Sequence, residues 1–218
     1  MSPVTVSPQL FLLLFAADAV FHLITLTLGL ERLRRISKVL LVPLLLAYYA
    51  TAAEHFLFIV LFAGIFGWIG DILLLKHDKH RLLLLGLAGF LLGHLGYINA
   101  LWHFTGAVDG IPLIIAIALA IPLGVFAIRM IRPIRAMRLP VCLYAAALGA
   151  MCISAFCLMR YRGDSMGTMI FAGSLCFAAS DTTLAYFLFR NLPRLANLVV
   201  MATYIAAQAG LIIGLAGL

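Results

Sequence analysis

Two aspartates lie inside long apolar stretches of the sequence and are the residues best suited to chemistry. Asp71 falls in the stretch 55–75, and Asp181 falls in the stretch 167–189. A carboxylate deep in a bilayer is costly unless it is paired, protonated or facing water, so spans keep one mainly for a reason. Two such groups in unequal surroundings can act as general acid and general base. Each could instead be a structural carboxylate bonded to a neighbouring helix.

Polar residues in other apolar stretches accompany the two aspartates. His94 and Tyr97 are three residues apart, and Tyr204 and Gln208 are four apart, so each pair lies on one face of a helix. Taken singly, a His or Tyr can be a packing residue, and a Lys at a span end can extend to the membrane surface. Together they predict a polar cavity in the cytoplasmic half of a helix bundle. Two further members, each near the start of its stretch, are Lys38 and Tyr144.

Asp18 and His22 form another pair on one helical face, four residues apart. They either join the polar cavity or satisfy each other. The sequence has no H-E-x-x-H motif and no two His four residues apart on one span, so a histidine-rich zinc site is poorly supported. Asp71, Asp181 and His94 could together hold a metal ion, but we expect no metal and no cofactor.

The composition indicates that lipid is the solvent of this chain. Of 218 residues, 65% are hydrophobic and 11% are charged, with a mean hydropathy of +1.16. A soluble domain carries roughly 25% charged residues. At about 20 apolar residues per spanning helix, the length suits one transmembrane domain, residues 1–218. The net charge of +7 does not indicate a nucleic-acid partner, because the charges lie between the apolar stretches.

We predict an all-α integral membrane protein, a bundle of eight transmembrane helices of which the second is the shortest. All Lys and Arg residues except Arg160 and Arg162 fall at alternate connections between the spans. The positive-inside rule then places both termini on the non-cytoplasmic side. The predicted spans are Pro8–Leu28, Lys38–Thr51, His55–Leu75, Leu82–Phe104, Ile111–Met130, Leu139–Met159, Gly167–Phe189 and Leu195–Gly217.

Small residues recur at the spacing of close helix contacts. One G-x-x-x-G covers residues 89–93 and another covers 210–214. The segments 70–74 and 180–184 each have a small residue, an Asp and a Leu at the same spacing, which suggests a faint internal repeat.

With these residues the sequence resembles the YhhN family of membrane lysoplasmalogenases. The similarity extends in order over nearly the whole chain. The family usually has Pro after the Lys of span two, whereas Val39 follows Lys38 here. The matching pieces are Ser37-Lys38, GDILLL at 70–75, FLLGHLGY at 90–97, Tyr144, Ala172-Gly-Ser174, Ser180-Asp181, and Tyr204 with Gln208.

The resemblance implies an enzyme that hydrolyses the vinyl ether bond of lysoplasmalogens. The products would be a fatty aldehyde and glycerophosphoethanolamine or glycerophosphocholine. The implied partners are the lysophospholipid substrate and membrane lipid, while the oligomeric state cannot be read from the sequence. We expect a multi-pass protein of a cell membrane, and its compact loops favour the bacterial inner membrane.

Vinyl ether hydrolysis begins with protonation of the alkene carbon and passes through an oxocarbenium ion. It needs an acid, a negative group that stabilises the cation, and a base that orients water. We expect Asp71 and Asp181 to be the catalytic pair, and the sequence does not distinguish acid from base. Lys38 would meet the lipid phosphate. The other residues expected to contact substrate, water or the carboxylates are His94, Tyr97, Tyr144, Ser174, Ser180, Tyr204 and Gln208.

Three other classes of protein share parts of this pattern. A lipid or small-molecule transporter also buries carboxylates near the midplane, often within broken helices and paired repeats. A zinc-dependent amide hydrolase of the ceramidase type would need metal ligands. A purely structural membrane protein would leave the two aspartates with no role beyond packing.

Overall fold

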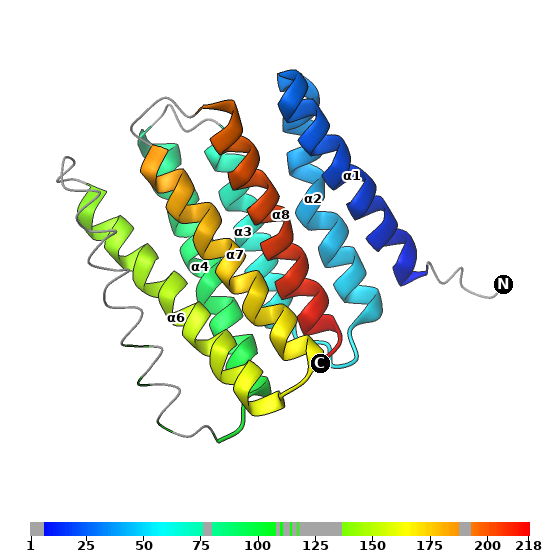
Figure 1. Cartoon of the computed structure of the whole chain (residues 1–218), viewed down its shortest axis with the longest axis vertical. Helices are drawn as coiled ribbons and strands as arrows, with labels where there is room; N and C mark the ends of the chain where they lie inside the picture. The colour runs from blue at the N-terminus through cyan, green and yellow to red at the C-terminus, as the bar shows by residue number, and fades with distance from the viewer. Residues whose placement is uncertain are drawn as a thin grey trace.

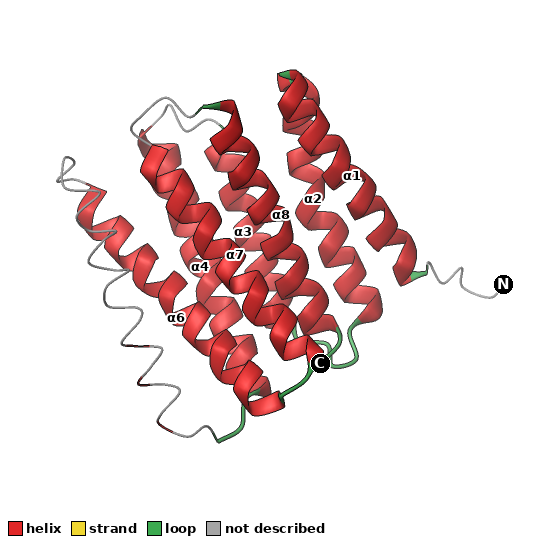
Figure 2. Cartoon of the chain, viewed as in Figure 1, coloured by secondary structure: helices red, strands yellow, loops and turns green. Residues whose placement is uncertain are grey.

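The computed structural model describes residues 7–75, 80–107, 137–187 and 193–218, and the single positions 110, 114 and 117. Within these residues the regular structure is helical, and no strand is present (Figures 1 and 2). The helices are α1 (Pro8–Leu28), α2 (Glu31–Ala52), α3 (Phe58–Leu74), α4 (His80–Phe104), α6 (Arg138–Arg162), α7 (Ser165–Phe187) and α8 (Arg194–Ala216).

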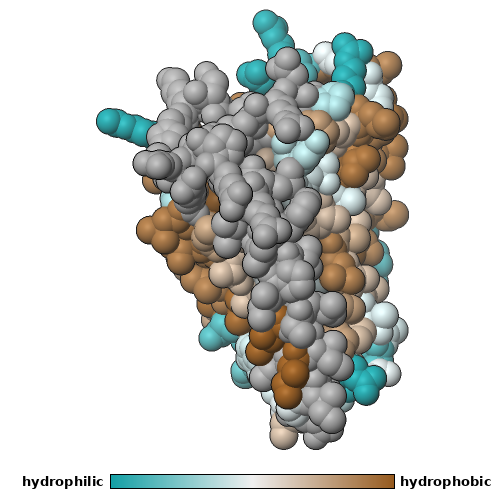
Figure 3. Space-filling model, turned by 60° about the vertical axis from the view of Figure 1, so that its left-hand side comes forward, coloured by the Kyte–Doolittle hydropathy of each residue, from teal (hydrophilic) through white to brown (hydrophobic). Residues whose placement is uncertain are grey.

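Six of these helices are long and apolar enough to cross a membrane, and α3 is shorter, with 17 residues. Figure 3 shows hydrophobic side chains across the middle of one face and hydrophilic residues mostly toward its two ends. The described part is therefore a multi-pass helical membrane protein. Seven of the eight predicted spans correspond to these helices. The fifth, Ile111–Met130, lies outside the described residues apart from two positions, so eight spans stay a prediction.

The predicted start of the second span is wrong. We expected it at Lys38, but α2 begins at Glu31, directly after a turn at Gly29 and Leu30. Gly29 has φ 72°, and the N–H of Leu30 donates to the carbonyl of Thr25 at 2.9 Å, so α1 ends in a tight turn. Basic side chains can reach the membrane surface from a helix and do not require a loop. The residues that consequently lie in the first turns of α2 are Arg32, Arg34, Arg35 and Lys38.

The other helix ends lie close to the predicted ones. α3 begins at Phe58 rather than His55, because a loop precedes it in which the N–H of Leu57 donates to the Tyr49 hydroxyl at 2.9 Å. α6 continues to Arg162, so the basic residues at its end lie in a helical turn, where they complement the helix C-terminus.

The start of α1 and the end of α8 lie toward the same end of the bundle (Figure 1). The α2–α3 loop is bonded to the end of α8, since the N–H of Glu54 donates to the carbonyl of Ala216 at 3.0 Å. Much of the basic sequence that predicted the orientation, residues 76–79, 129–136 and 188–190, lies outside the described residues. The non-cytoplasmic placement of both termini therefore stays a prediction.

Glycine contacts bring α3 against α4 and α7 against α8. A Cβ on Gly89 would lie 2.9 Å from the carbonyl oxygen of Phe66, and a Cβ on Gly210 would lie 2.9 Å from Cα of Gly173. Any larger residue would push the helix backbones apart. Both predicted G-x-x-x-G segments thus lie at helix contacts, and the two close pairs contain the helices that carry the aspartates.

Candidate active site

Asp71 on α3 is held by an ammonium group and a phenol inside the bundle. Nζ of Lys38 on α2 lies 3.3 Å from Oδ1, and the hydroxyl of Tyr204 on α8 donates to Oδ2. The side chain of Asp71 is 2% exposed and that of Lys38 is 17% exposed. The carboxylate therefore has both a counter-charge and a second donor, which a buried anion needs.

Hydrogen bonds continue from Asp71 across the bundle. Nε2 of Gln208 donates to the Tyr204 hydroxyl at 3.0 Å, and the hydroxyl of Tyr97 on α4 donates to Oε1 of Gln208 at 3.2 Å. The Lys38 ammonium lies 5.8 Å from the centre of the Tyr204 ring. These five residues, from α2, α3, α4 and α8, form one connected group, the Asp71 cluster.

Asp181 on α7 has different surroundings. The hydroxyl of Tyr144 on α6 donates to its Oδ2, and no salt bridge joins Asp181 to a basic side chain among the described residues. Asp181 is partly exposed, in contrast to Asp71. The ring of His94 on α4 packs against Tyr144, with centroids 5.2 Å apart. Asp181, Tyr144 and His94 form the Asp181 cluster.

Two phenylalanines connect the clusters. The Phe177 ring lies 4.8 Å from His94 and 5.8 Å from Tyr204, and the Phe90 ring lies 6.3 Å from Phe177. Neither Phe residue was predicted to be part of a site, because nothing in an apolar span distinguishes an aromatic wall from ordinary packing.

Pro43 explains how α2 presents Lys38 to Asp71. Proline has no N–H, so the carbonyl of Val39 lacks its usual helical donor four residues later. The indole Nε1 of Trp68 on α3 donates to the Val39 oxygen instead, at 2.8 Å. Val39 adjoins Lys38, and Trp68 precedes Asp71 by three residues. The bond therefore fixes α2 to α3 beside the ion pair.

Comparison with known protein families identifies the family of this chain. The YhhN family model matches residues 33–215. The chain belongs to the YhhN family. The match contains every residue of both clusters and begins after α1. No curated protein and no solved structure matches the chain.

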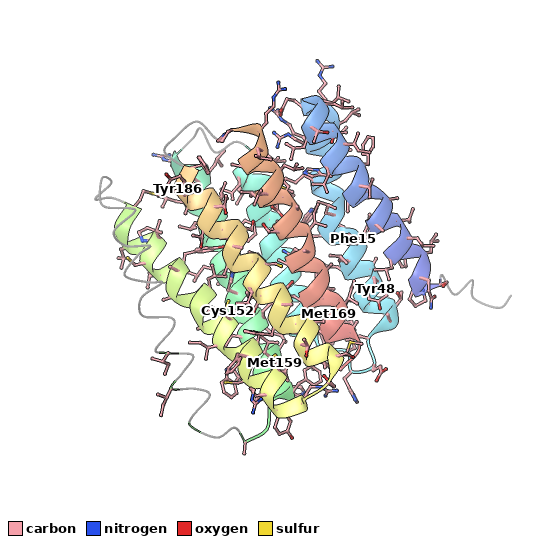
Figure 4. All side chains as sticks on the ribbon, in the orientation of Figure 1. Phe15, Tyr48, Cys152, Met159, Met169 and Tyr186 are labelled. Carbon is pink, nitrogen blue, oxygen red and sulfur yellow. The ribbon has the colours of Figure 1, made fainter. Side chains whose placement is uncertain are left out.

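Two serines of this YhhN chain that we expected at the substrate bond to backbone carbonyls. The hydroxyl of Ser174 donates to Phe171 at 2.7 Å, and that of Ser180 donates to Val200 at 3.0 Å, which joins α7 to α8. Cys152 on α6, labelled in Figure 4, donates its thiol to the Ser174 carbonyl at 3.4 Å. The Ser174 hydroxyl bond stays within α7, whereas the Ser180 and Cys152 bonds join α7 to its neighbours; a substrate role for either serine stays a prediction.

Asp18 and His22 lie on α1, beside the Asp71 cluster rather than in it. Nδ1 of His22 lies 2.8 Å from the hydroxyl of Ser37, which adjoins Lys38. Asp18 Oδ2 and His22 Nε2 are both buried without a hydrogen-bond partner among the described residues, so these atoms do not satisfy each other. In the same part of the chain, no three His, Cys, Asp or Glu side chains converge as metal ligands.

A cavity of about 320 Å³ lies between α2 and α3 and is lined by Arg35, Ile36, Val39, Leu40 and Leu75. Its walls are apolar throughout, so Arg35 contributes the aliphatic part of its side chain. Val39 adjoins Lys38, and Leu75 follows Asp71 by one helical turn, so this cavity and the ion pair share the same two helices. A larger cavity, of about 530 Å³, contains no residue of either cluster and lies among loop and helix-end residues near Glu54.

Proposed function

We propose that this YhhN protein hydrolyses the vinyl ether bond of lysoplasmalogens to a fatty aldehyde and glycerophosphoethanolamine or glycerophosphocholine. Family membership and the multi-pass helical fold support a membrane-embedded lipid substrate. The observation that carries the proposal is the pair of aspartates in unequal surroundings, one bonded to Lys38 and Tyr204 and the other to Tyr144 alone. We place the protein in a cell membrane, with the bacterial inner membrane as the proposed location.

The surroundings of the two carboxyl groups divide their roles. The direct ammonium contact of Lys38 compensates the charge of Asp71. Asp181 has a hydroxyl donor and no direct cation. Asp71 is therefore the ionised group that stabilises an oxocarbenium ion, and Asp181 is the protonated group that acts as the acid.

The proposed reaction has three steps. Asp181 transfers its proton to the alkene carbon farther from the ether oxygen, and the remaining carbon–oxygen unit becomes an oxocarbenium ion beside the Asp71 carboxylate. Water adds to the cationic carbon as one of its O–H bonds breaks and a base in the site takes the proton, which gives a hemiacetal. In the last step the bond between the hemiacetal carbon and the glycerol oxygen breaks. The hemiacetal hydroxyl returns its proton to Asp181 and becomes the aldehyde. The glycerol oxygen takes the proton that water lost in the second step.

The cavity between α2 and α3 fits the approach of a single-chain lipid. Its apolar walls, including Ile36 and Leu40, suit a hydrocarbon chain. Because Lys38 is already bonded to Asp71, the exposed Arg35 on the same helix is a second candidate for the phosphate contact predicted for Lys38.

Turnover of lysoplasmenylethanolamine by the purified protein in detergent tests this function. Aldehyde release is measured for wild type, Asp71→Asn and Asp181→Asn, with and without a chelator. We expect aldehyde from wild type alone, at the same rate with chelator. Wild-type turnover in both variants would sink the carboxylate mechanism. A folded wild type that releases no aldehyde, whatever the chain length and head group supplied, would sink the proposed activity.

A further inference from the structure

His94 is a buried polar residue of the Asp181 cluster that the steps above leave without a role. It is 2% exposed and lies on α4 between the rings of Tyr144 and Phe177, at centroid distances of 5.2 and 4.8 Å. One ring nitrogen, Nδ1, lies 2.5 Å from the carbonyl oxygen of Phe90. The other, Nε2, has no hydrogen-bond partner among the residues that the structure describes.

The contact with Phe90 determines which nitrogen of His94 carries the hydrogen. A carbonyl oxygen can only accept, so Nδ1 must be the N–H donor. A doubly protonated ring would place a charged and unpaired N–H in the bundle interior, which is strongly unfavourable. The ring is therefore neutral, and Nε2 presents a lone pair.

The neighbouring hydroxyl groups cannot donate to this lone pair. Tyr144 donates its hydrogen to Asp181, Tyr204 donates to Asp71, and Tyr97 donates to Gln208. Buried polar atoms nearly always have a partner, in the protein or in a bound molecule. The partner of Nε2 must consequently bring its own hydrogen, as water or a substrate hydroxyl does.

We propose that Nε2 of His94 accepts the hydrogen bond of the water that attacks the oxocarbenium ion and takes its proton. This inference rests on the proposed function. The water oxygen forms its bond to the cationic carbon as one O–H bond breaks and its proton moves to Nε2. The same proton then passes from Nε2 to the glycerol oxygen when the hemiacetal collapses, so His94 ends neutral. With this role for His94, Asp71 only stabilises the cation. Asp181 gives its proton to the alkene carbon and receives one from the hemiacetal hydroxyl.

The kinetic experiment compares His94→Asn and His94→Gln with matched changes at His103, an exposed residue on the same helix. Asn can keep the donor to Phe90 but has no group at the position of Nε2, whereas Gln offers an amide oxygen that accepts but does not take a proton. We expect both His94 variants to lose at least about 100-fold in kcat with KM changed less than about threefold. His103→Asn and His103→Gln should keep wild-type kinetics.

A second measurement distinguishes a base from a packing residue. In protein labelled with ¹⁵N at histidine, we expect the His94 signal of a ring protonated at Nδ1 and bare at Nε2. A proton on Nε2 overturns the inference, as does wild-type kcat in His94→Asn while Asp181→Asn is inactive; either result leaves the proposed function standing. Absence of aldehyde from wild type overturns the proposed function, and this step with it.

Discussion

Asp71 and Asp181 lie on different helices, follow a small residue and accept a hydrogen bond from a tyrosine, yet their surroundings differ. Lys38 contacts Asp71 at 3.3 Å, whereas Asp181 has no salt bridge among the described residues and is partly exposed. The same side chain with the same kind of donor is thus given two electrostatic environments. In the proposed reaction, this difference would let one carboxyl group work as an anion and the other as an acid.

Gly70 and Ser180, which directly precede the two aspartates, pack their helices in different ways. A Cβ on Gly70 would lie 2.7 Å from the Phe90 ring, so glycine lets α4 approach α3. Ser180 instead donates its hydroxyl to Val200 and joins α7 to α8. The faint repeat in the sequence therefore corresponds to two helices with similar partners but different means of packing.

The largest effect should follow from removing the acid. Asp181→Asn takes away the transferable proton, and we expect turnover to fall about 10³-fold, within the range for a general acid. The amide can still accept from Tyr144, so the fold should survive. Aldehyde release, with unfolding followed in parallel, is the measurement. If Asp181→Asn kept its rate while Asp71→Asn lost it, Asp181 would not be the acid.

The free energy of unfolding should fall more in Asp71→Asn than in Asp181→Asn. Asp71→Asn leaves the Lys38 ammonium without its partner, and we expect a loss of about 2 kcal/mol, reduced from the fully buried case because Lys38 is partly exposed. Adding Lys38→Met should recover part of the loss, and Asp181→Asn should cost less than Asp71→Asn. Denaturant unfolding in detergent provides the values. Equal losses in the free energy of unfolding for Asp71→Asn and Asp181→Asn would contradict this difference between the two clusters.

The two tyrosines should reproduce the contrast on a smaller scale. Tyr204→Phe removes a donor to Asp71 and an acceptor for Gln208, so we expect it to cost about 1.5 kcal/mol. Tyr144→Phe removes one bond, and we expect about 1 kcal/mol. Unfolding of both variants under one condition tests the order. A larger loss for Tyr144→Phe would contradict the connected Asp71 cluster.

Loss of the hydrogen bond from Trp68 to Val39 should disturb the Asp71 cluster and not the Asp181 cluster. Trp68→Phe leaves the Val39 carbonyl without a donor, and we expect a loss of about 1 kcal/mol together with weaker turnover, because α2 presents Lys38. Pro43→Ala restores a backbone N–H at that position, so the double variant should be closer to wild type than Trp68→Phe. Additive losses in the double variant would show that the bond does not compensate for the proline.

The smallest effect concerns the start of α7. Asp164 caps this helix, since the N–H of Gly167 donates to its Oδ1 at 2.8 Å, and this bond, with Arg162, lowers the pKa of Asp164. A lowered folded-state pKa means that the stabilisation is present above the unfolded pKa and is lost as the pH falls through the folded one. We expect Asp164→Ala to reduce stability slightly near neutral pH, not in strong acid, with turnover unchanged. A pH-independent difference between the variant and wild type would refute this account of the cap.

Hydropathy predicted the helices well, because each span is a local property of about 20 residues. The start of α1 at Pro8 and its end at Leu28 are confirmed, as is YhhN membership for residues 33–215. The second span was predicted too short, since basic residues were read as a loop. A two-residue turn at Gly29 allows the helix to begin seven residues before Lys38.

The sequence by itself determined that this chain is helical and membrane-embedded, and which polar residues its apolar spans contain. Residue type and hydropathy suffice for this, because an unpaired polar group in lipid is costly wherever the helix packs. Only the tertiary structure decided that Lys38 and Tyr204 hold Asp71 while Tyr144 holds Asp181, and that Nε2 of His94 is left without a protein partner. Tyr204 and Asp71 are 133 residues apart, and no local preference relates positions so distant. Their contact joins α8 to α3, whereas the close glycine contacts join α3 to α4 and α7 to α8, and the Trp68 bond joins α2 to α3.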